Sequence, residues 1–226
     1  MQRRTTARIA IDRPKTTTLK RSVFPVSPRI RLKLGAFLAV LLLTTAACRQ
    51  HQFTATVFED AEPAPEIRGR NYDGTPFELA QLKGGPVLLF FGYTFCPDVC
   101  PMTMMELAEA KRALARDAPA LAAGLQLVFV TIDPQRDNLA RIEPYVKAFH
   151  PQFYGVHLPE TALDALRPAY GLFVEPPEGS SLSDDYYLLD HTSRVFLIDR
   201  KGNWLGLFSA EVTAEELTDD LKALLR

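Results

Sequence analysis

Two runs, one continuously apolar and one largely apolar, constrain the fold of this 226-residue chain more than any other feature. They cover residues 87–93 (VLLFFGY) and 125–132 (LQLVFVTI), and a segment with apolar residues at helical spacing, about residues 97–117, separates them. A strand that is apolar at every position is buried on both faces, and a strand–helix–strand order favours parallel strands. The sequence therefore predicts an α/β domain with parallel strands at the centre of its sheet.

Further elements extend this sheet on both sides. Residues 67–72 and 76–79 flank an Asp73-Gly74 pair, which predicts a hairpin. Residues 139–149 and 161–170 are expected to be helices, 194–198 and 204–208 antiparallel strands, and 213–225 a closing helix whose Thr213 and Glu216 are spaced as a capping box. This order is typical of a thioredoxin-like domain, a mixed sheet flanked by helices, with an added N-terminal β-hairpin. We expect that domain over residues 66–226.

The charge of the chain is divided between two parts. Residues 1–48 hold ten Lys or Arg and one acidic residue, a formal charge of +9, whereas residues 49–226 hold sixteen basic and twenty-six acidic residues, a formal charge of −10. A basic arm followed by the short apolar run 34–47 predicts an export signal. The net charge of −1 gives no global basic excess, so we expect no nucleic-acid partner.

The apolar run ends in small residues followed by Cys48. Its 15 uncharged residues, 34–48, would form a helix of about 22 Å, shorter than the ~30 Å hydrocarbon core of a bilayer. This resembles a bacterial lipoprotein signal, in which Cys48 would be lipidated and become the mature N-terminus. An uncleaved signal anchor and an ordinary cleavage site are the alternatives. All three place the domain on the extracytoplasmic face of the cell membrane, with residues 49–65 as a flexible tether.

The junction between the first buried strand and its helix carries a Cys96-x-x-x-Cys100 pair. On a helical turn, residues four apart lie on one face with Cβ atoms about 5–6 Å apart, so the two sulfurs could close a disulfide or hold one metal ion. Pro97 suits the first helical position, and the partial positive charge of a helix N-terminus favours thiolates. The alternative is a pair of buried structural thiols or an inert disulfide.

A third ligand would complete a copper site, because two thiolates favour Cu(I) and an imidazole allows Cu(II) as well. His191 lies on a loop that leads into the strand 194–198 and could lie beside the cysteines; otherwise it is a loop histidine bonded to the backbone. His51 in the tether, His150 at a helix end and His157 in a short extended piece are less suitable. The residues alone leave this ligand open.

Three methionines follow the cysteines and could supply thioether ligands to copper. Met102 and Met105 are three residues apart, and we expect them to pack in the first turn of the helix, with Met104 exposed. The sequence thus favours a packing role for this pair over a ligand role.

Four segments, taken together and in this order, resemble the Sco/SenC family: FGYTFCPDVCPMT at 91–103, TIDPQRD at 131–137, FHPQFYG at 149–155 and DHTSRVFLID at 190–199. The resemblance covers about residues 60–226. It implies a thioredoxin-like fold and one copper per chain, Cu(I) or Cu(II), bound by Cys96, Cys100 and His191. Phe95 stands where many members have His, and Thr192 stands where Ser is usual.

Acidic residues in the same segments have less direct expected roles. Asp133 and Asp137 match the family's DPxRD stretch, and we expect them to cap the turn between strand and helix rather than to take part in catalysis. Asp98, between the cysteines, could tune the thiols or repel anionic partners, but a carboxylate is not a soft copper ligand.

The resemblance implies a membrane-tethered metallochaperone that delivers copper to the binuclear copper centre of cytochrome c oxidase subunit II, or to another apo copper protein, after loading by an upstream copper donor. The alternative is a thiol–disulfide reductase that uses Cys96 and Cys100 as redox-active thiols and keeps the acceptor's cysteines reduced. A copper or redox sensor and a peroxidase are less favoured, the latter because peroxidases attack with one dominant cysteine.

Overall fold

The computed structural model describes residues 51–175 and 187–225. The predicted export signal, with Cys48, lies outside these residues. The strands are β1 Thr56–Val57, β2 Arg68–Asn71, β3 Pro76–Glu78, β4 Val87–Gly92, β5 Gln126–Thr131, β6 Phe153–His157, β7 Val174–Glu175, β8 Asp190–His191, β9 Arg194–Ile198 and β10 Trp204–Ser209. The helices are the 3-10 turn η1 Leu79–Leu82, α2 Val99–Asp117, α3 Pro119–Gly124, α4 Leu139–Phe149, α5 Glu160–Tyr170 and α6 Ala214–Leu224.

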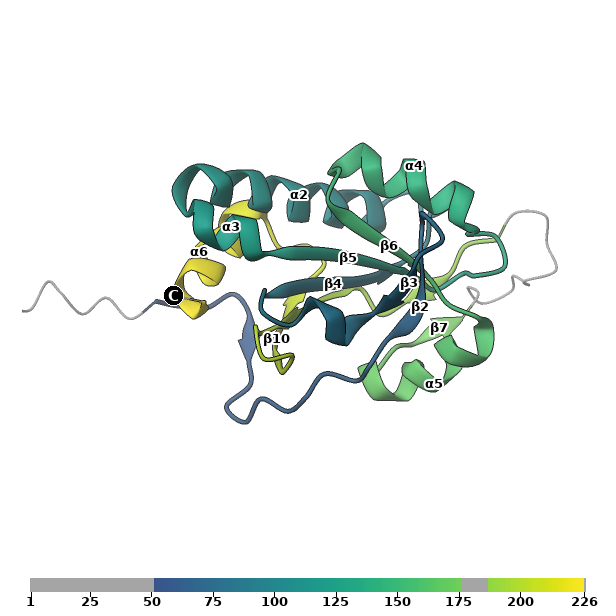
Figure 1. The fold of residues 1–226 in the computed structure, drawn as a ribbon, viewed down its shortest axis with the longest axis horizontal. Helices are drawn as coiled ribbons and strands as arrows, with labels where there is room; N and C mark the ends of the chain where they lie inside the picture. Colours follow the sequence, from purple (N-terminus) through teal and green to yellow (C-terminus); the bar gives the residue numbers. More distant parts are fainter. Residues whose placement is uncertain (1–50, 176–186, 226) are drawn as a thin grey trace, which may run out of the picture. The chain divides into compact units, whose positions relative to one another are not determined.

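Eight strands form one mixed sheet in the order β1-β10-β9-β4-β5-β6-β2-β3, and β7 pairs with β8 in a separate two-stranded sheet. The central strands β4, β5 and β6 are parallel, and the strands on both sides of them are antiparallel. Helices α2, α4 and α6 cover one face of the large sheet, and α5 covers the other (Figure 1). The predicted parallel centre with antiparallel edges is therefore present.

The two apolar runs form the centre of the core, as their composition predicts. Every residue of β4 is buried, and its side chains alternate between the two helical layers. Phe90 lies near Phe129 on the side of α4, whereas Phe91 contacts Tyr170 of α5 with ring centroids 5.1 Å apart. This burial on both faces explains why the sequence of β4 has no polar alternation.

The predicted N-terminal hairpin is present as β2 and β3, which pair antiparallel across the Asp73-Gly74 turn. It joins the sheet through β6, a strand that the sequence pattern did not identify. Gly155 interrupts the apolar pattern of β6 for a steric reason, since a Cβ there would lie 2.4 Å from Cγ2 of Ile142 in α4. Because α4 packs closely on β6, position 155 has no room for a side chain. The sequence of β6 therefore lacks the apolar pattern that would predict a strand.

The segment expected to be a flexible tether differs from that expectation over residues 51–65. Strand β1 pairs with β10, Ala55 is buried, and its N–H donates to a carboxylate oxygen of Asp220 in α6 at 2.8 Å. The polar composition of residues 51–65 did not predict this pairing, because backbone groups form it and side-chain type does not reveal them. Gly206 of β10 permits it, since a Cβ there would lie 2.5 Å from the Thr56 carbonyl oxygen. Residues 51–65 thus pack on the domain in part, through β1 and Ala55.

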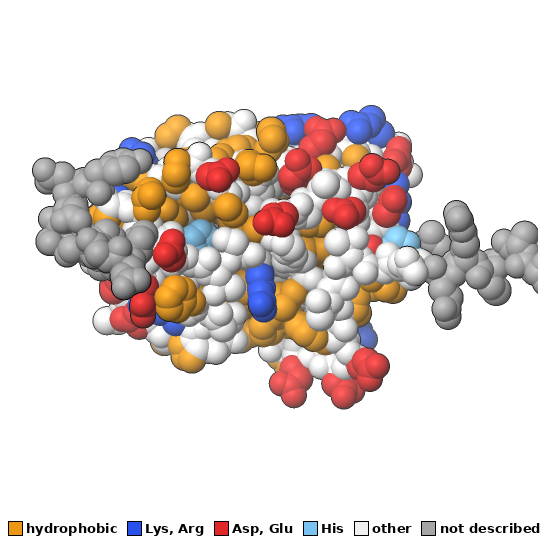
Figure 2. Space-filling model, turned by 180° about the vertical axis from the view of Figure 1, so that it is seen from behind, with side chains coloured by type: hydrophobic (Ala, Val, Ile, Leu, Met, Phe, Trp, Pro, Cys, Tyr) orange, Lys and Arg blue, Asp and Glu red, His pale blue; other side chains and the backbone are white. Residues whose placement is uncertain are grey.

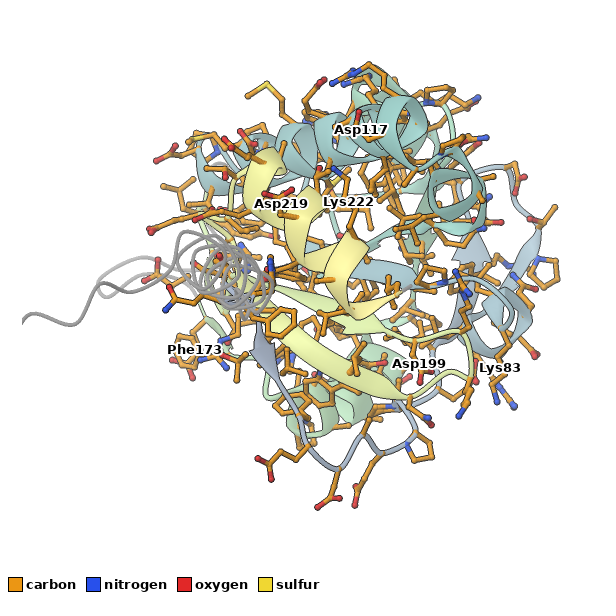
Figure 3. The ribbon with its side chains drawn as sticks, turned by 90° about the vertical axis from the view of Figure 1, so that its left-hand side faces the viewer. Lys83, Asp117, Phe173, Asp199, Asp219 and Lys222 are labelled. Atoms are coloured by element: carbon orange, nitrogen blue, oxygen red, sulfur yellow. The ribbon has the colours of Figure 1, made fainter. Side chains whose placement is uncertain are left out.

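The closing helix α6 packs against α2, and its start is fixed as predicted. Thr213 and Glu216 form a complete capping box. Near the other end, Lys222 lies between Asp117 of α2 and Asp219, at 3.1 and 3.9 Å (Figure 3). Over the part of the chain that the structure describes, no helix is long and apolar enough to cross a membrane.

Candidate metal centre

The Cys96–Cys100 pair lies where β4 turns into α2. The helix begins at Val99 with Asp98 as the N-cap, so Pro97 precedes it and is not the first helical residue as expected. The reason is a tight turn before the helix, in which the Cys96 N–H donates to the Tyr93 carbonyl oxygen at 3.2 Å. Cys100 is buried in the first helical turn, whereas Cys96 is half-buried in the loop.

This turn brings the two cysteines together, although only Cys100 is helical. The Cys100 N–H lies 3.5 Å from the Sγ atom of Cys96, so the N-terminus of the helix faces that sulfur. Both thiols are free in this structure. The predicted proximity is thus correct, and its cause is a turn that folds back on the helix start.

His191 is the third member of this group, although it lies far after both cysteines in the sequence. It lies in the short strand β8, and its Nε2 atom is 3.5 Å from the Sγ atom of Cys100. Its Nδ1 atom lies 3.1 Å from the carbonyl oxygen of Thr192, which can only accept, so Nδ1 carries the proton and the Nε2 lone pair is directed to the sulfurs. The ligand atoms of Cys96, Cys100 and His191 lie within 4.8 Å of one another.

The surroundings of the two thiols shift their pKa values in opposite directions. Hydrogen bonds from the Cys100 thiol and from the backbone N–H groups of Asp98 and Cys100 hold the pKa of Cys96 well below that of an ordinary thiol. The hydrogen bond to Cys96, burial and the charge of Cys96 raise the pKa of Cys100. The apo site is therefore a thiolate beside a buried thiol. That arrangement suits a soft metal ion, which displaces the second proton on binding.

Tyr93 holds the loop that carries His191. Its hydroxyl accepts a hydrogen bond from the Leu189 N–H at 3.1 Å and donates to the Leu189 carbonyl oxygen at 3.4 Å. Burial raises the pKa of Tyr93 to about 12, so it remains a neutral donor. Its ring also meets the His191 ring edge-on at 5.8 Å. One residue at the end of β4 thus fixes the ligand loop from 96 positions away in sequence.

Arg136 joins the same loop to the cysteine loop. Its guanidinium lies 3.3 Å from the ring centroid of Tyr187 and 4.5 Å from that of Phe95, and it donates to the Tyr187 carbonyl oxygen at 2.9 Å. Asp133 orients both partners, accepting from Arg136 Nε at 2.6 Å and from the Tyr187 hydroxyl at 2.8 Å. Asp133 therefore has a different role from the expected turn cap.

Asp137 also has a different role from the expected cap. The helix α4 is capped by Asn138, whose side chain accepts from the Arg141 N–H. Asp137 is fully buried and accepts from the Thr94 N–H at 2.9 Å and the Thr131 hydroxyl at 2.7 Å. It thereby fixes the residue two positions before Cys96. Burial raises the pKa of Asp137.

The structure does not bring the other candidate histidines to this site. His51 pairs with Asp220 at 2.6 Å, His150 accepts from the Gln152 N–H, and His157 contacts the Pro134 carbonyl oxygen.

The expected orientation of the methionines is wrong. Met104 is fully buried, whereas Met102 and Met105 are 57% and 53% exposed. The reason is the helix phase, because the buried positions of α2 run from Cys100 through Thr103 and Met104.

Tyr93, Arg136 and Tyr187 are the supporting residues that sequence reasoning missed. Arg136 and Tyr93 lie inside the family-like segments 131–137 and 91–103. Membership of these segments was the only signal for Tyr93 and Arg136, and Tyr187 had none. The hydrogen bonds that join Arg136 to Tyr187 and Tyr93 to Leu189 span 51 and 96 positions, which a sequence pattern does not show.

A profile of the SCO1/SenC family matches residues 64–226. The chain belongs to the SCO1/SenC family. Among curated members, it is 33% identical over 150 residues to the SCO2-like protein of Rickettsia felis, a match that covers 66% of this chain and 71% of the relative. The family assignment from the four sequence segments is therefore confirmed.

Solved SCO structures share the fold. Apo Sco1 from Thermus thermophilus is 32% identical, with a TM-score of 0.68 over 79% of this chain and 100% of the solved chain. Bradyrhizobium japonicum ScoI with copper bound is 31% identical, with a TM-score of 0.63 over 72% and 99% of the two chains. The thioredoxin domain of a Bacteroides vulgatus thiol–disulfide oxidoreductase, 16% identical with a TM-score of 0.52 over 75% and 99% of the chains, shares the fold alone. The predicted thioredoxin-like fold is confirmed.

Proposed function

We propose that this chain is a membrane-tethered, extracytoplasmic copper metallochaperone that binds one copper ion through Cys96, Cys100 and His191 and delivers it to the binuclear copper centre of cytochrome c oxidase subunit II. The convergence of two sulfurs and one imidazole nitrogen within 4.8 Å carries this proposal. Copper-bound ScoI of Bradyrhizobium japonicum, 31% identical, supports copper as the metal.

The geometry suits a carrier because it combines a buried ligand with a half-buried one. Cys100 is fully buried and fixed in α2, whereas Cys96 lies half-buried in a loop. An acceptor ligand can therefore approach from the side of Cys96 and replace this sulfur first, while Cys100 and His191 still hold the ion. Stepwise exchange of this kind transfers copper without releasing it to water.

Copper binding to the full-length chain in detergent tests the proposal. We expect one tightly bound copper per reduced chain, and a much weaker affinity in His191→Ala. His157→Ala is the matched control, because that imidazole is hydrogen-bonded to the Pro134 carbonyl oxygen and is not among the converging ligand groups, so it should not affect copper. Equal copper affinity in the unchanged chain and in His191→Ala would refute the three-ligand site.

Delivery needs a separate assay, because binding alone does not identify an acceptor. Copper-loaded chain is mixed with the apo copper domain of a cytochrome c oxidase subunit II, and the absorption of the binuclear centre is followed. Appearance of that absorption, and its absence with His191→Ala, supports delivery. A loaded chain that keeps its copper beside the acceptor contradicts it.

A second function, thiol–disulfide reduction, is supported by the unequal thiols. The lowered pKa of Cys96 makes it a suitable attacking thiolate, and buried Cys100 could resolve the mixed disulfide. Reduction of a disulfide in the acceptor's copper site would then leave a Cys96–Cys100 disulfide in this chain, which an external thiol reductant must reduce. Retention of this activity in His191→Ala, together with loss of copper binding, would separate the two functions.

A further inference from the structure

Two exposed methionines lie on α2 just beyond the copper site. Met102 and Met105 are the two most exposed large hydrophobic residues among those described, at 57% and 53%. They are three apart in the helix, so their Cβ atoms lie about 5–6 Å from each other on one face. The helix does not need them for packing, because Thr103, Met104 and Leu107 fill the buried face.

The position of this pair relates it to the copper ligands. Met102 follows Cys100 by two residues, which is about 3 Å along the helix axis. Cys100 points to the core and the two methionines point to solvent, on the opposite side of the same first turns. Cys96 precedes the helix and is half-buried, so the exposed end of the copper site and the methionine pair share the N-terminal end of α2.

The charge around the pair favours a cation. Exposed Asp98 lies one turn before Met102, and exposed Glu109 lies one turn after Met105. Glu106, one turn after Met102, is half-buried and accepts from the Ala214 N–H at 2.6 Å. Hydrophobic and acidic side chains lie next to each other over the upper part of the face in Figure 2, where α2 lies. Glu109 is partly neutralised by Arg112 and Arg116, at 3.4 and 3.5 Å. Thioether sulfur is a soft ligand, which selects Cu(I) over the harder divalent ions that carboxylates alone would hold.

We propose that Met102 and Met105 form a second, weaker Cu(I) site that captures copper at the surface and passes it to Cys96 and Cys100. This capture role rests on the proposed copper-carrier function; the binding of Cu(I) by the pair does not. In the transfer, Cu–thioether bonds are replaced by Cu–thiolate bonds, the Cys100 thiol releases its proton to water, and copper remains Cu(I), so no reductant or oxidant is required.

The test uses methyl NMR of the full-length chain in detergent, labelled at the methionine methyl groups. The chain has four methionines, so each resonance can be assigned by Met→Leu substitution. The probe is Ag(I), a soft ion that resists redox change, added to a Cys96→Ser/Cys100→Ser chain that lacks the main site. The resonances of Met102 and Met105 should shift together, whereas buried Met104 is the internal control and should not shift.

Transfer is tested by loading the unchanged chain with limiting Cu(I) in competition with a chromophoric chelator. Met102→Leu/Met105→Leu should take up copper more slowly but reach the same final occupancy, and Met104→Leu should behave as the unchanged chain. Methyl shifts in Met102 and Met105 without tight binding at Cys96 and Cys100 would refute the carrier function and leave the methionine site. Unshifted methyl resonances would overturn the methionine site alone and leave the pair as an apolar contact surface.

Discussion

Gly92 is the residue where a single added methyl group should disturb the copper site most directly. It ends β4, and a Cβ at this position would lie 2.9 Å from the Sγ atom of Cys100, 2.9 Å from Cε1 of Phe90 and 3.1 Å from Cε2 of Phe129. Real Cβ atoms essentially never approach another heavy atom to less than 3.0 Å. All three neighbours are fully buried, so none can move into solvent to make room.

The expected cost of Gly92→Ala follows from this packing. Adding a methyl group to a close-packed core costs about 1–3 kcal/mol, because neighbours are forced from their preferred positions. The sulfur of Cys100 is one of the atoms that must move, and it is only 3.5 Å from Nε2 of His191. Since 1.4 kcal/mol corresponds to a factor of ten in affinity, we expect copper to bind about ten- to a hundredfold more weakly.

Two measurements on the same preparation check this expectation. Urea unfolding of the apo chain reports the packing cost, and a competitive copper titration reports the displacement of the ligand. Gly124→Ala is the matched control, because its nearest contact would be Cδ of Pro86 at an ordinary 3.8 Å, so both measurements should stay near those of the unchanged chain. A Gly92→Ala chain that binds copper as tightly as the unchanged one would refute the reasoning, even if it unfolds more easily.

Three further predictions concern stability and thiol chemistry. Thr213→Ala removes the capping box of α6 and should lower the free energy of unfolding by about 1 kcal/mol in urea; an unchanged midpoint would contradict the cap. Asp220→Ala leaves the buried Ala55 N–H without its acceptor, which should cost about 1–3 kcal/mol and open residues 51–57 to limited proteolysis; unaltered protection would contradict this. Iodoacetamide should alkylate Cys96 but not Cys100 in the apo chain at about pH 6, where an ordinary thiol with a pKa of about 8.5 is protonated. Mass spectrometry of the two peptides reads this out, and equal labelling would show that their pKa values do not differ as described.

The elements with a simple periodicity were predicted closely, because their own residues define them. Helix α4 and strand β9 have the predicted bounds, and the capping box at Thr213 is present. Strands β1 and β6 were missed for different reasons. Strand β1 is formed by backbone pairing with β10, and β6 has a glycine where α4 packs closely on it. The start of α2 was placed two residues too early, since the turn that contains Cys96 depends on the Tyr93 carbonyl oxygen.

The sequence alone determined the parallel centre of the sheet, the place of the Cys96–Cys100 pair and the family of the chain. These features depend on residues near one another along the chain, so their pattern is readable without coordinates. The family resemblance implied His191, and the tertiary structure shows that it lies beside the two cysteines. Only the tertiary structure revealed that Asp133 and Arg136 connect the ligand loops. His191 lies 91 positions after Cys100, and the packing of β9 against β4 sets the distance between them. A sequence pattern does not record such distances, because they result from how the whole sheet is assembled.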